Sequence, residues 1–422
     1  MAVLAYSEGP PRRVVVTGMG VIAPSGRDLA TFWENVCAGR SAAGPVTRFK
    51  AEECPSHYAC EVRDWTPTDY MDVKTAKRFE RSLQFGVAAA KCAAADARID
   101  FNDTDPDRCG IVEATSLSNM EAAYRAREAL DTRGFRAISP SMMISGYVGS
   151  GSAEIAMQLG LKGHAITCSS SSASGSDVMG YALNMIHHEE VDMMVAGGTE
   201  APIVDTVFFG FSQSRAMTRW PGPAHAAMKP FDKAGDGFLM GEGGAYLVLE
   251  EIGHALSRGA QIYAEVLGHG RSCESYHPMA PHPDGWGVSR AMEKAMRAAR
   301  IDPSAVDCIN VHGTATAVND IAETRAIKNT FGAHAHRLAV IATKPITGHP
   351  LAAAGALEAV ISVLSLKHQI IPPTINLTDP LPECDLDYVP GVARPYPTRV
   401  VLSLNSGFGG KTSCLILGRY PA

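Results

Sequence analysis

The sequence of 422 residues lacks the paired cysteines on which metal ribbons and redox motifs are built. Its ten cysteines are scattered and form no C-x-x-C, which excludes zinc ribbons and thioredoxin-like sites. A chain of this length needs no disulfide staples, and free thiols suit a reducing compartment. We therefore expect no metal site and a soluble cytoplasmic protein.

Long hydrophobic runs and a strong net charge are also missing. No apolar stretch stands ahead of a cleavage site near the start, and other apolar runs fall short of the roughly 18–20 residues of a membrane span. The formal net charge of -6 gives no global field that attracts nucleic acid. The sequence predicts neither a membrane nor a nucleic-acid partner, and residues 1–11 are expected to be a disordered leader.

The chain does contain short β-rich runs that alternate with longer helical patterns. Residues 13–18 read as a buried strand, 77–97 as a helix, and 306–314 as a strand running into a loop. The stretch 351–369 is apolar on all sides, so we expect a helix sandwiched between sheets. This alternation predicts an α/β protein with largely covered sheets.

Two glycine motifs resemble nucleotide-binding loops, and both fail. Gly18-x-Gly20-x-x-Ala23 follows a strand, but Pro24 breaks the chain where a helix would have to start. GGKTS at 409–413 lacks the first glycine of a phosphate loop and leaves too little chain for the following helix. We expect structural glycines and no bound nucleotide.

Four separated segments carry candidate chemistry. ITCSSSSASGSD (166–177) reads as a strand, a sharp turn and a helix, an arrangement that exposes one side chain at a helix N-terminus. His312 stands at a probable strand end, Lys344 and His349 precede a helix, and NSGFGG (405–410) lets backbone amides approach a ligand. Taken singly, each segment has a structural interpretation as an N-cap, a satisfied histidine or a turn.

Together the four segments resemble the β-ketoacyl-acyl-carrier-protein synthases, condensing enzymes of the thiolase superfamily. The likeness runs from VVVTGMGVIAPSG to NSGFGG and is strongest toward the ketosynthase (alpha) subunits of type II polyketide systems; fatty-acid ketosynthases are close relatives. It implies a five-layered αβαβα fold made of two related halves, which we place at 12–258 and 259–422. It also implies decarboxylative condensation of malonyl-carrier protein with an acyl chain.

The resemblance implies a role for each site residue. His312 and His349 would stabilise the enolate formed on decarboxylation, and Lys344 would support His349, with Glu323 in the charge balance. Phosphopantetheine would arrive on the carrier protein, so no cofactor is expected on the enzyme. The remaining roles are the backbone amides of Ser172 and Phe408 as an oxyanion hole, and Thr314 and Thr316 as hydrogen-bond partners of the pantetheine arm.

At the nucleophile the sequence departs from the family pattern, because Ser172 occupies the cysteine position. Cys168, four residues earlier, is expected inside the incoming strand. A serine hydroxyl needs a general base, and its oxyester passes an acyl group to a carbanion less readily than a thioester does. Three explanations stay open: an engineered cysteine-to-serine variant, a natural serine acyltransferase, or a noncatalytic partner of the chain-length-factor type.

The resemblance also implies partners. An acidic carrier protein would dock on basic residues, for which Lys77, Arg78 and Arg219 are the candidates. The family is dimeric, which predicts a homodimer or a heterodimer with a chain-length-factor homologue, paired through the strand that follows the nucleophile helix. Side chains on the substrate side are expected at Phe208, Phe209 and Met217.

Overall fold

The computed structural model describes residues 12–101, 104–117 and 120–421, so the predicted leader at 1–11 lies outside the described residues. Buried β-branched and aliphatic residues form one ten-stranded sheet, in the order β11-β10-β14-β15-β9-β1-β8-β6-β4-β5. Its strands are β1 (Val14–Ile22), β4 (Cys109–Ala114), β5 (Ala165–Cys168), β6 (Met193–Glu200), β8 (Gly243–Glu251), β9 (Ala264–Cys273), β10 (Cys308–Asn310), β11 (Ala339–Ile341), β14 (Val400–Gly407) and β15 (Lys411–Arg419).

The sheet is built from two halves with the same topology. In each half the first strand pairs antiparallel with the last, the last pairs antiparallel with the fourth, and the second lies parallel between the third and fourth. The halves join where Val14–Val16 of β1 pairs with Ala264–Val266 of β9. The expected α/β fold of two related halves is confirmed.

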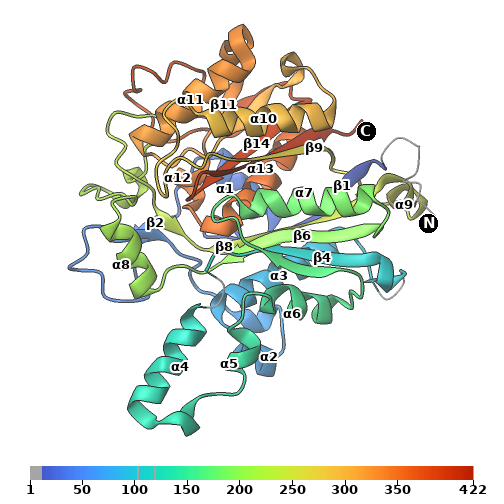
Figure 1. Cartoon of the computed structure of the whole chain (residues 1–422), viewed down its shortest axis with the longest axis vertical. Helices are drawn as coiled ribbons and strands as arrows, with labels where there is room; N and C mark the ends of the chain where they lie inside the picture. Colours follow the sequence, from blue (N-terminus) through green and yellow to red (C-terminus); the bar gives the residue numbers. More distant parts are fainter. Residues whose placement is uncertain (1–11, 102–103, 118–119, 422) are drawn as a thin grey trace.

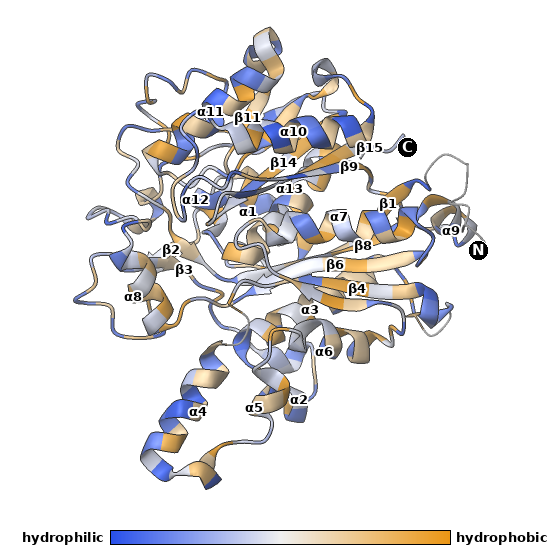
Figure 2. Cartoon of the chain, viewed as in Figure 1, coloured by the Kyte–Doolittle hydropathy of each residue, from blue (hydrophilic) through white to orange (hydrophobic). Residues whose placement is uncertain are grey.

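Helices complete the layers around the two halves of the sheet (Figure 1). The central helices α7 (Ser174–His187) and α13 (Ala354–His368) each contact strands of both halves. The helix α3 (Arg81–Asp96) covers β1, β8 and β6 from outside, and α10 (Trp286–Ala299) covers β9 and β15. This is the five-layered arrangement that the resemblance implied, and in Figure 2 the outer α10 carries many hydrophilic residues.

The apolar helix expected at 351–369 lies at the centre of the molecule. A short 3-10 turn, η8 (Leu351–Ala353), leads into α13, where every residue from Ala354 to Leu366 is buried. By length and composition alone Leu351–His368 could cross a membrane, but 89% of it is buried inside the protein. Burial against both halves of the sheet accounts for its apolar composition.

The remaining α-helices and strands connect and cover these layers. They are α1 (Leu29–Cys37), α2 (Val73–Arg78), α4 (Met120–Arg133), α5 (Met142–Ser145), α6 (Ser150–Leu159), α8 (Asp205–Gln213), α9 (Ile252–Ser257), α11 (Ala317–Phe331), α12 (Lys344–Thr347), β2 (Ala43–Pro45), β3 (Tyr58–Cys60), β7 (Met240–Gly241), β12 (Ile370–Ile371) and β13 (Arg394–Pro395). α4 and α5 project from the body of the molecule (Figure 1).

Three local expectations differ from the structure. The helix expected at 77–97 is interrupted, because Phe79 is extended between α2 and α3. The strand expected at 306–314 is limited to β10, and His312 lies in the loop that follows. The strand that follows α7, β6, is paired on both sides with β4 and β8, so it cannot pair with another subunit; the edge strands of the sheet are β5 and β11.

Candidate active site

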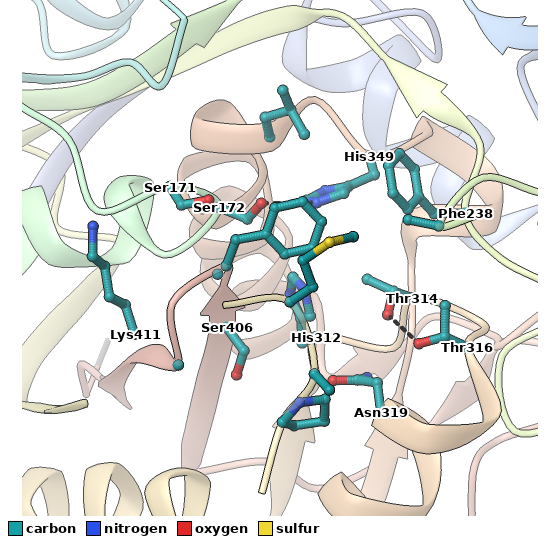
Figure 3. A pocket seen from close by; sticks show the side chains of 18 of the residues that line it. Ser171, Ser172, Phe238, His312, Thr314, Thr316, Asn319, His349, Ser406 and Lys411 are labelled. Atoms are coloured by element: carbon teal, nitrogen blue, oxygen red, sulfur yellow. Dashed lines mark hydrogen bonds between the residues drawn. The ribbon is translucent and has the colours of Figure 1, made fainter. Parts of the chain in front are cut away.

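A cavity of about 520 Å³ brings together residues from all four predicted segments. Its lining includes Ser172, His312, His349 and Phe408, which come from both halves of the chain. Figure 3 shows Ser172 and His349 close together, with His312 facing the same space. The four segments therefore form one site.

Ser172 lies in a tight turn between β5 and α7. Ser171, just before it, adopts a left-handed backbone with φ of 59°. Such a conformation in a residue with a side chain is strained by about 1 kcal/mol or more and persists only where the surroundings hold it. Ser174 supplies that hold, since its Oγ donates to the Ser171 carbonyl (2.5 Å) and accepts from the Ser170 amide (2.8 Å).

The turn places Ser172 against His349. Ser172 Oγ lies 3.0 Å from His349 Nε2, and the serine is only 7% exposed. Cys168 ends β5 as expected, its pKa is raised by burial, and it is not among the described residues that line the cavity. Ser172, and not Cys168, therefore lies in the cavity within hydrogen-bond distance of a histidine.

The two histidines face each other with their rings nearly perpendicular. The His312 and His349 ring centroids are 5.4 Å apart with an interplanar angle of 86°. Burial, together with the nearby Lys344 charge, lowers the pKa of both imidazoles well below its ordinary value. Both rings are therefore neutral near pH 7, so a ring nitrogen can accept the Ser172 proton.

Glu323 holds the His312 loop by its backbone. Its carboxylate accepts from the amides of His312 (2.5 Å) and Gly313 (2.9 Å). Burial raises the pKa of Glu323 to about 7, although these amides and Lys344 oppose the shift. Its carboxylate thus fixes the loop, and the nearby Lys344 charge lowers its pKa, in keeping with the expected place of Glu323 in the charge balance.

Lys344 pairs with Glu358, a residue that the sequence motifs did not single out. Lys344 Nζ and Glu358 Oε1 are 2.5 Å apart, and both side chains are at least 97% buried. Glu358 is the sole acidic residue of the apolar helix α13. A lone carboxylate in a fully buried helix requires a cationic or hydrogen-bonding partner, which is the signal that could have found it.

The NSGFGG segment forms the hairpin between β14 and β15 and brings Phe408 to the cavity. A Cβ added at Gly407 would lie 3.0 Å from the Ser172 amide nitrogen, so only glycine allows this close approach. The Phe408 ring stacks on Phe211, with centroids 5.9 Å apart. The segments that carry the two proposed oxyanion-hole amides are thus in contact.

Thr314 and Thr316 line the same cavity. Their hydroxyl oxygens lie 3.4 Å apart, and Figure 3 shows both on the side of the cavity away from Ser171. Ala315 between them has a left-handed φ of 59°. This strained link turns both threonine side chains toward the cavity.

Other predicted residues lie away from the cavity. Lys77 and Arg219 are exposed, whereas Arg78 is paired with the buried Glu154 at 2.8 Å. The aromatic side chains expected on the substrate side are replaced in the described lining by Phe211 and Phe238, while Phe208 and Met217 are buried in the core. Phe209 is 38% exposed and is also absent from that lining.

No group of three or more His, Cys, Asp or Glu side chains within residues 12–101, 104–117 and 120–421 is arranged to hold a metal ion.

Known proteins resemble this chain along nearly its whole length. Residues 11–255 match the family model "Beta-ketoacyl synthase, N-terminal domain", and residues 263–378 match its C-terminal domain. The chain is 40% identical to the 3-oxoacyl-[acyl-carrier-protein] synthase 2 of Synechocystis sp. over 97% of this chain and 98% of that protein. The Coxiella burnetii protein of the same name is 41% identical over 97% and 99%.

Solved structures also resemble this chain along nearly its whole length. The ishigamide ketosynthase/chain length factor superposes with a TM-score of 0.91 at 35% identity, over 98% of this chain and 100% of that one. A type II PKS acyl-carrier protein in complex with its ketosynthase bound to the hexaketide contains a chain with a TM-score of 0.90 at 33% identity, covering 97% and 100%. On these matches, the chain belongs to the beta-ketoacyl synthase family.

Proposed function

We propose that the chain is a β-ketoacyl-acyl-carrier-protein synthase of the type II polyketide kind, with Ser172 as the acyl acceptor. The observation that carries the proposal is the 3.0 Å contact between Ser172 Oγ and His349 Nε2 in a cavity that both histidines share. The relatives named above are 3-oxoacyl-[acyl-carrier-protein] synthases, and the superposed chains belong to a ketosynthase/chain length factor and to a complex of an acyl-carrier protein with its ketosynthase. A fatty-acid ketosynthase is the neighbouring alternative.

Acylation would start from an acyl thioester of the carrier protein. Ser172 Oγ attacks the thioester carbon, a C–O bond forms and the C–S bond breaks, while the serine proton passes through His349 to the departing thiolate. The amides of Ser172 and Phe408 would stabilise the oxyanion of the tetrahedral intermediate. A neutral His349 is required, which agrees with its lowered pKa.

Condensation would follow with malonyl-carrier protein as the second substrate. The malonyl group loses CO₂, and neutral His312 and His349 donate N–H hydrogen bonds to the enolate oxygen. The enolate carbon attacks the acyl carbon, a C–C bond forms, and the C–O bond to Ser172 breaks, while the departing Ser172 alkoxide takes a proton from solvent through His349. Thr314 and Thr316 would hold the pantetheine arm during both steps.

The partners follow from this reaction. Phosphopantetheine would enter on an acidic acyl carrier protein, for which Lys77, Arg78 and Arg219 remain the proposed docking residues. Arg78 would have to leave Glu154 to take part. We also propose a cytoplasmic location and a dimer, formed with a second copy or with a chain-length-factor homologue.

A second candidate function is favoured by the same serine–histidine contact. An oxyester at Ser172 is less reactive than a thioester, so the enzyme could transfer acyl groups between thiols or hydroxyls without condensing them. A noncatalytic partner of the chain-length-factor type is the third candidate. The intact histidines and Lys344 favour the first two functions over this one.

The test follows both half-reactions in the same samples. Acyl-carrier protein and carboxyl-labelled malonyl-carrier protein are supplied to the wild type, Ser172→Cys and His312→Ala. We expect a Ser172 adduct by intact mass spectrometry, CO₂ release by the wild type, and elongation that rises more than about tenfold in Ser172→Cys. His312→Ala should lower CO₂ release by about 10²-fold.

The outcomes separate the three candidates. An adduct without CO₂ release, even in Ser172→Cys, favours the acyltransferase. Wild type and Ser172→Cys that give neither an adduct nor CO₂, with a chain-length-factor partner present, would rule out catalysis by this chain.

A further inference from the structure

A buried chain of hydrogen bonds runs from Lys344 to the nucleophile helix. Lys344 Nζ lies 2.5 Å from Glu358 Oε1, and Asn405 Nδ2 donates to the other oxygen, Oε2, at 2.6 Å. Ser176 Oγ then donates to Asn405 Oδ1 at 2.5 Å. All four residues are at most 3% exposed.

This chain crosses four elements that carry different parts of the site. Lys344 begins α12, Glu358 lies on α13, Asn405 on β14, and Ser176 in the first turn of α7. Ser176 follows Ser172 by four residues, and Asn405 precedes Phe408 by three. The polar chain therefore links the ammonium group to the two segments assigned to the oxyanion hole.

The packing of the helices leaves room for this link. A Cβ added at Gly355 of α13 would lie 2.6 Å from Ser176 Oγ and 2.8 Å from Asn405 Oδ1. Both distances are shorter than van der Waals contact, so any other residue at 355 would displace the hydrogen bond. The absence of a side chain at this point is an observation independent of the hydrogen bonds.

The position of Lys344 matters because its charge acts on every titratable group around it. It lowers the pKa of His312 and His349, opposes the raised pKa of Glu323, and pairs with Glu358. The hydrogen bond from Asn405 lowers the pKa of Glu358 against the effect of burial. Asn405 thus favours the charged carboxylate that holds Lys344 in place.

We propose that Ser176 and Asn405 are positioning residues, which fix the Lys344–Glu358 pair relative to the turn that carries Ser172. Neither residue lines the described cavity, so they act through Glu358 and Lys344 and not on the substrate. The proposal rests on the proposed function for its effect on rate, but its effect on the histidines can be measured without turnover.

The first experiment measures the pKa of His349 by NMR of the histidine-labelled protein, with the signal assigned from His349→Gln. Asn405→Leu removes both hydrogen bonds at similar volume, and Ser176→Ala removes one. Without these hydrogen bonds the Glu358 carboxylate no longer fixes Lys344, and we expect the ammonium group to move away from His349. Because the Lys344 charge lowers the pKa of His349, that pKa should rise, by roughly half a unit or more in Asn405→Leu and less in Ser176→Ala. Ser362→Ala is the matched control, because Ser362 is equally buried but bonds the Glu358 carbonyl.

The second experiment measures CO₂ release from malonyl-carrier protein as a function of pH. The active form has a neutral His349 and a charged Glu358 carboxylate. A higher pKa of either group means that this form is lost at a higher pH when the solution is acidified. We expect the acid limb of the profile to move upward in Asn405→Leu and Ser176→Ala, and to stay in place in Ser362→Ala.

The two experiments have outcomes that would overturn the positioning role. Folded variants in which the His349 pKa equals that of the wild type, or in which Ser362→Ala shifts as far as Ser176→Ala, overturn the positioning role. If Asn405→Leu does not fold, Ser176→Ala against Ser362→Ala decides. A wild type that releases no CO₂ contradicts the proposed function, while the NMR comparison still decides the positioning role.

Discussion

Ser172 and a cysteine at the same place would differ mainly in acidity. A thiol at a helix N-terminus can ionise near neutral pH, whereas a serine hydroxyl keeps its proton until a base removes it. The base available here is His349, whose Nε2 lies 3.0 Å from Ser172 Oγ and whose pKa is lowered by burial and by Lys344. The neutral imidazole therefore compensates in part for the weaker nucleophile.

Glu113 is a second residue whose titration is set by burial, and it lies outside the site. Its carboxylate accepts from Thr167 Oγ1 (3.0 Å) and Tyr246 OH (3.2 Å) but has no cationic partner in the described part of the chain. Burial raises its pKa from 4.5 to about 7 despite these bonds. Ionisation of this group in the folded protein is therefore unfavourable.

We predict that Glu113→Gln makes the free energy of unfolding of the protein less dependent on pH. A carboxyl group with a raised folded pKa stabilises the protein fully below the unfolded pKa, and this contribution is lost as pH rises through the folded value. The shift from 4.5 to about 7 corresponds to about 3 kcal/mol. In urea unfolding, the free energy of unfolding of Glu113→Gln relative to that of the wild type should rise by this amount between about pH 4 and pH 8.

The matched control for this prediction is Glu34→Gln, since the Glu34 side chain is 68% exposed. The free energy of unfolding of this variant should stay parallel to that of the wild type across the same pH range. A difference between Glu113→Gln and the wild type that stays constant with pH would contradict the assignment.

The sequence predicts which residues meet in the site better than it predicts how they are paired. Ser172, His312, Lys344 and His349 were placed by motif, and the structure brings all four together. Glu323 was expected only to contribute to the charge balance, and Glu358, the carboxylate that pairs with Lys344, was not identified from the sequence. Spacing along the chain cannot decide which of two buried carboxylates a cation reaches, because that depends on how α11 and α13 pack.

At the scale of the elements, the crossing of α7 and α13 sets the geometry of the site. A Cβ at Gly175 of α7 would lie 2.6 Å from the Ala352 carbonyl oxygen, and one at Gly355 of α13 would lie 2.5 Å from the Ser176 amide nitrogen. The two backbones therefore touch, and side chains at these positions would push the helices apart. Ser172 stands just before one helix and His349 just before the other.

We predict that Gly355→Ala lowers both the stability of the protein and its rate of CO₂ release. Overpacking of a tight core contact is expected to lower the free energy of unfolding by about 1–3 kcal/mol and to reduce CO₂ release, measured by urea unfolding and by the decarboxylation assay. Gly210→Ala on α8 is the control, because nothing lies within 4 Å of its added Cβ. It should be neutral or stabilise by up to about 1 kcal/mol.

Equal stability of Gly355→Ala and Gly210→Ala would mean that the helices have room to separate.

The boundaries of the helices are harder to predict from the sequence than the helices themselves. The helix expected at 77–97 follows the pattern of helical residues correctly but misses the break at Phe79. That break depends on where Asp72 caps α2 and on how α3 packs against β1 and β8, which local composition does not contain.

At the scale of the whole molecule, the repeated halves leave two sheet edges with different surroundings. β11 closes one edge, and β5 closes the other. Near β5 lies an exposed apolar surface on α6, which packs against the strand, on α5, which packs against α6, and on the loop between the two helices. Its members are Met143, Ile144, Tyr147, Val148, Met157 and Ile166, each between 39% and 74% exposed.

An apolar surface beside an open strand edge is typical of a surface that another protein covers. The sequence resemblance predicted a dimer but assigned the contact to the strand after α7, which is interior. The strand before α7, β5, has the free edge because the two halves repeat one topology with its short third strand outermost. This strand also leads directly into the turn that carries Ser172, so a partner bound there would steady that turn.

We predict that the chain self-associates through β5 and that Ile166→Asp prevents it. A carboxylate at a desolvated strand edge opposes pairing because it would be buried without a partner. Sedimentation should give the wild type twice the mass of the chain and Ile166→Asp the mass of one chain. Leu256→Asp on α9, where the leucine is 57% exposed and remote from β5 along the sheet order, should remain a dimer. An Ile166→Asp variant that stays dimeric, or a wild type that is monomeric at micromolar concentration, would show that β5 does not pair with a second copy.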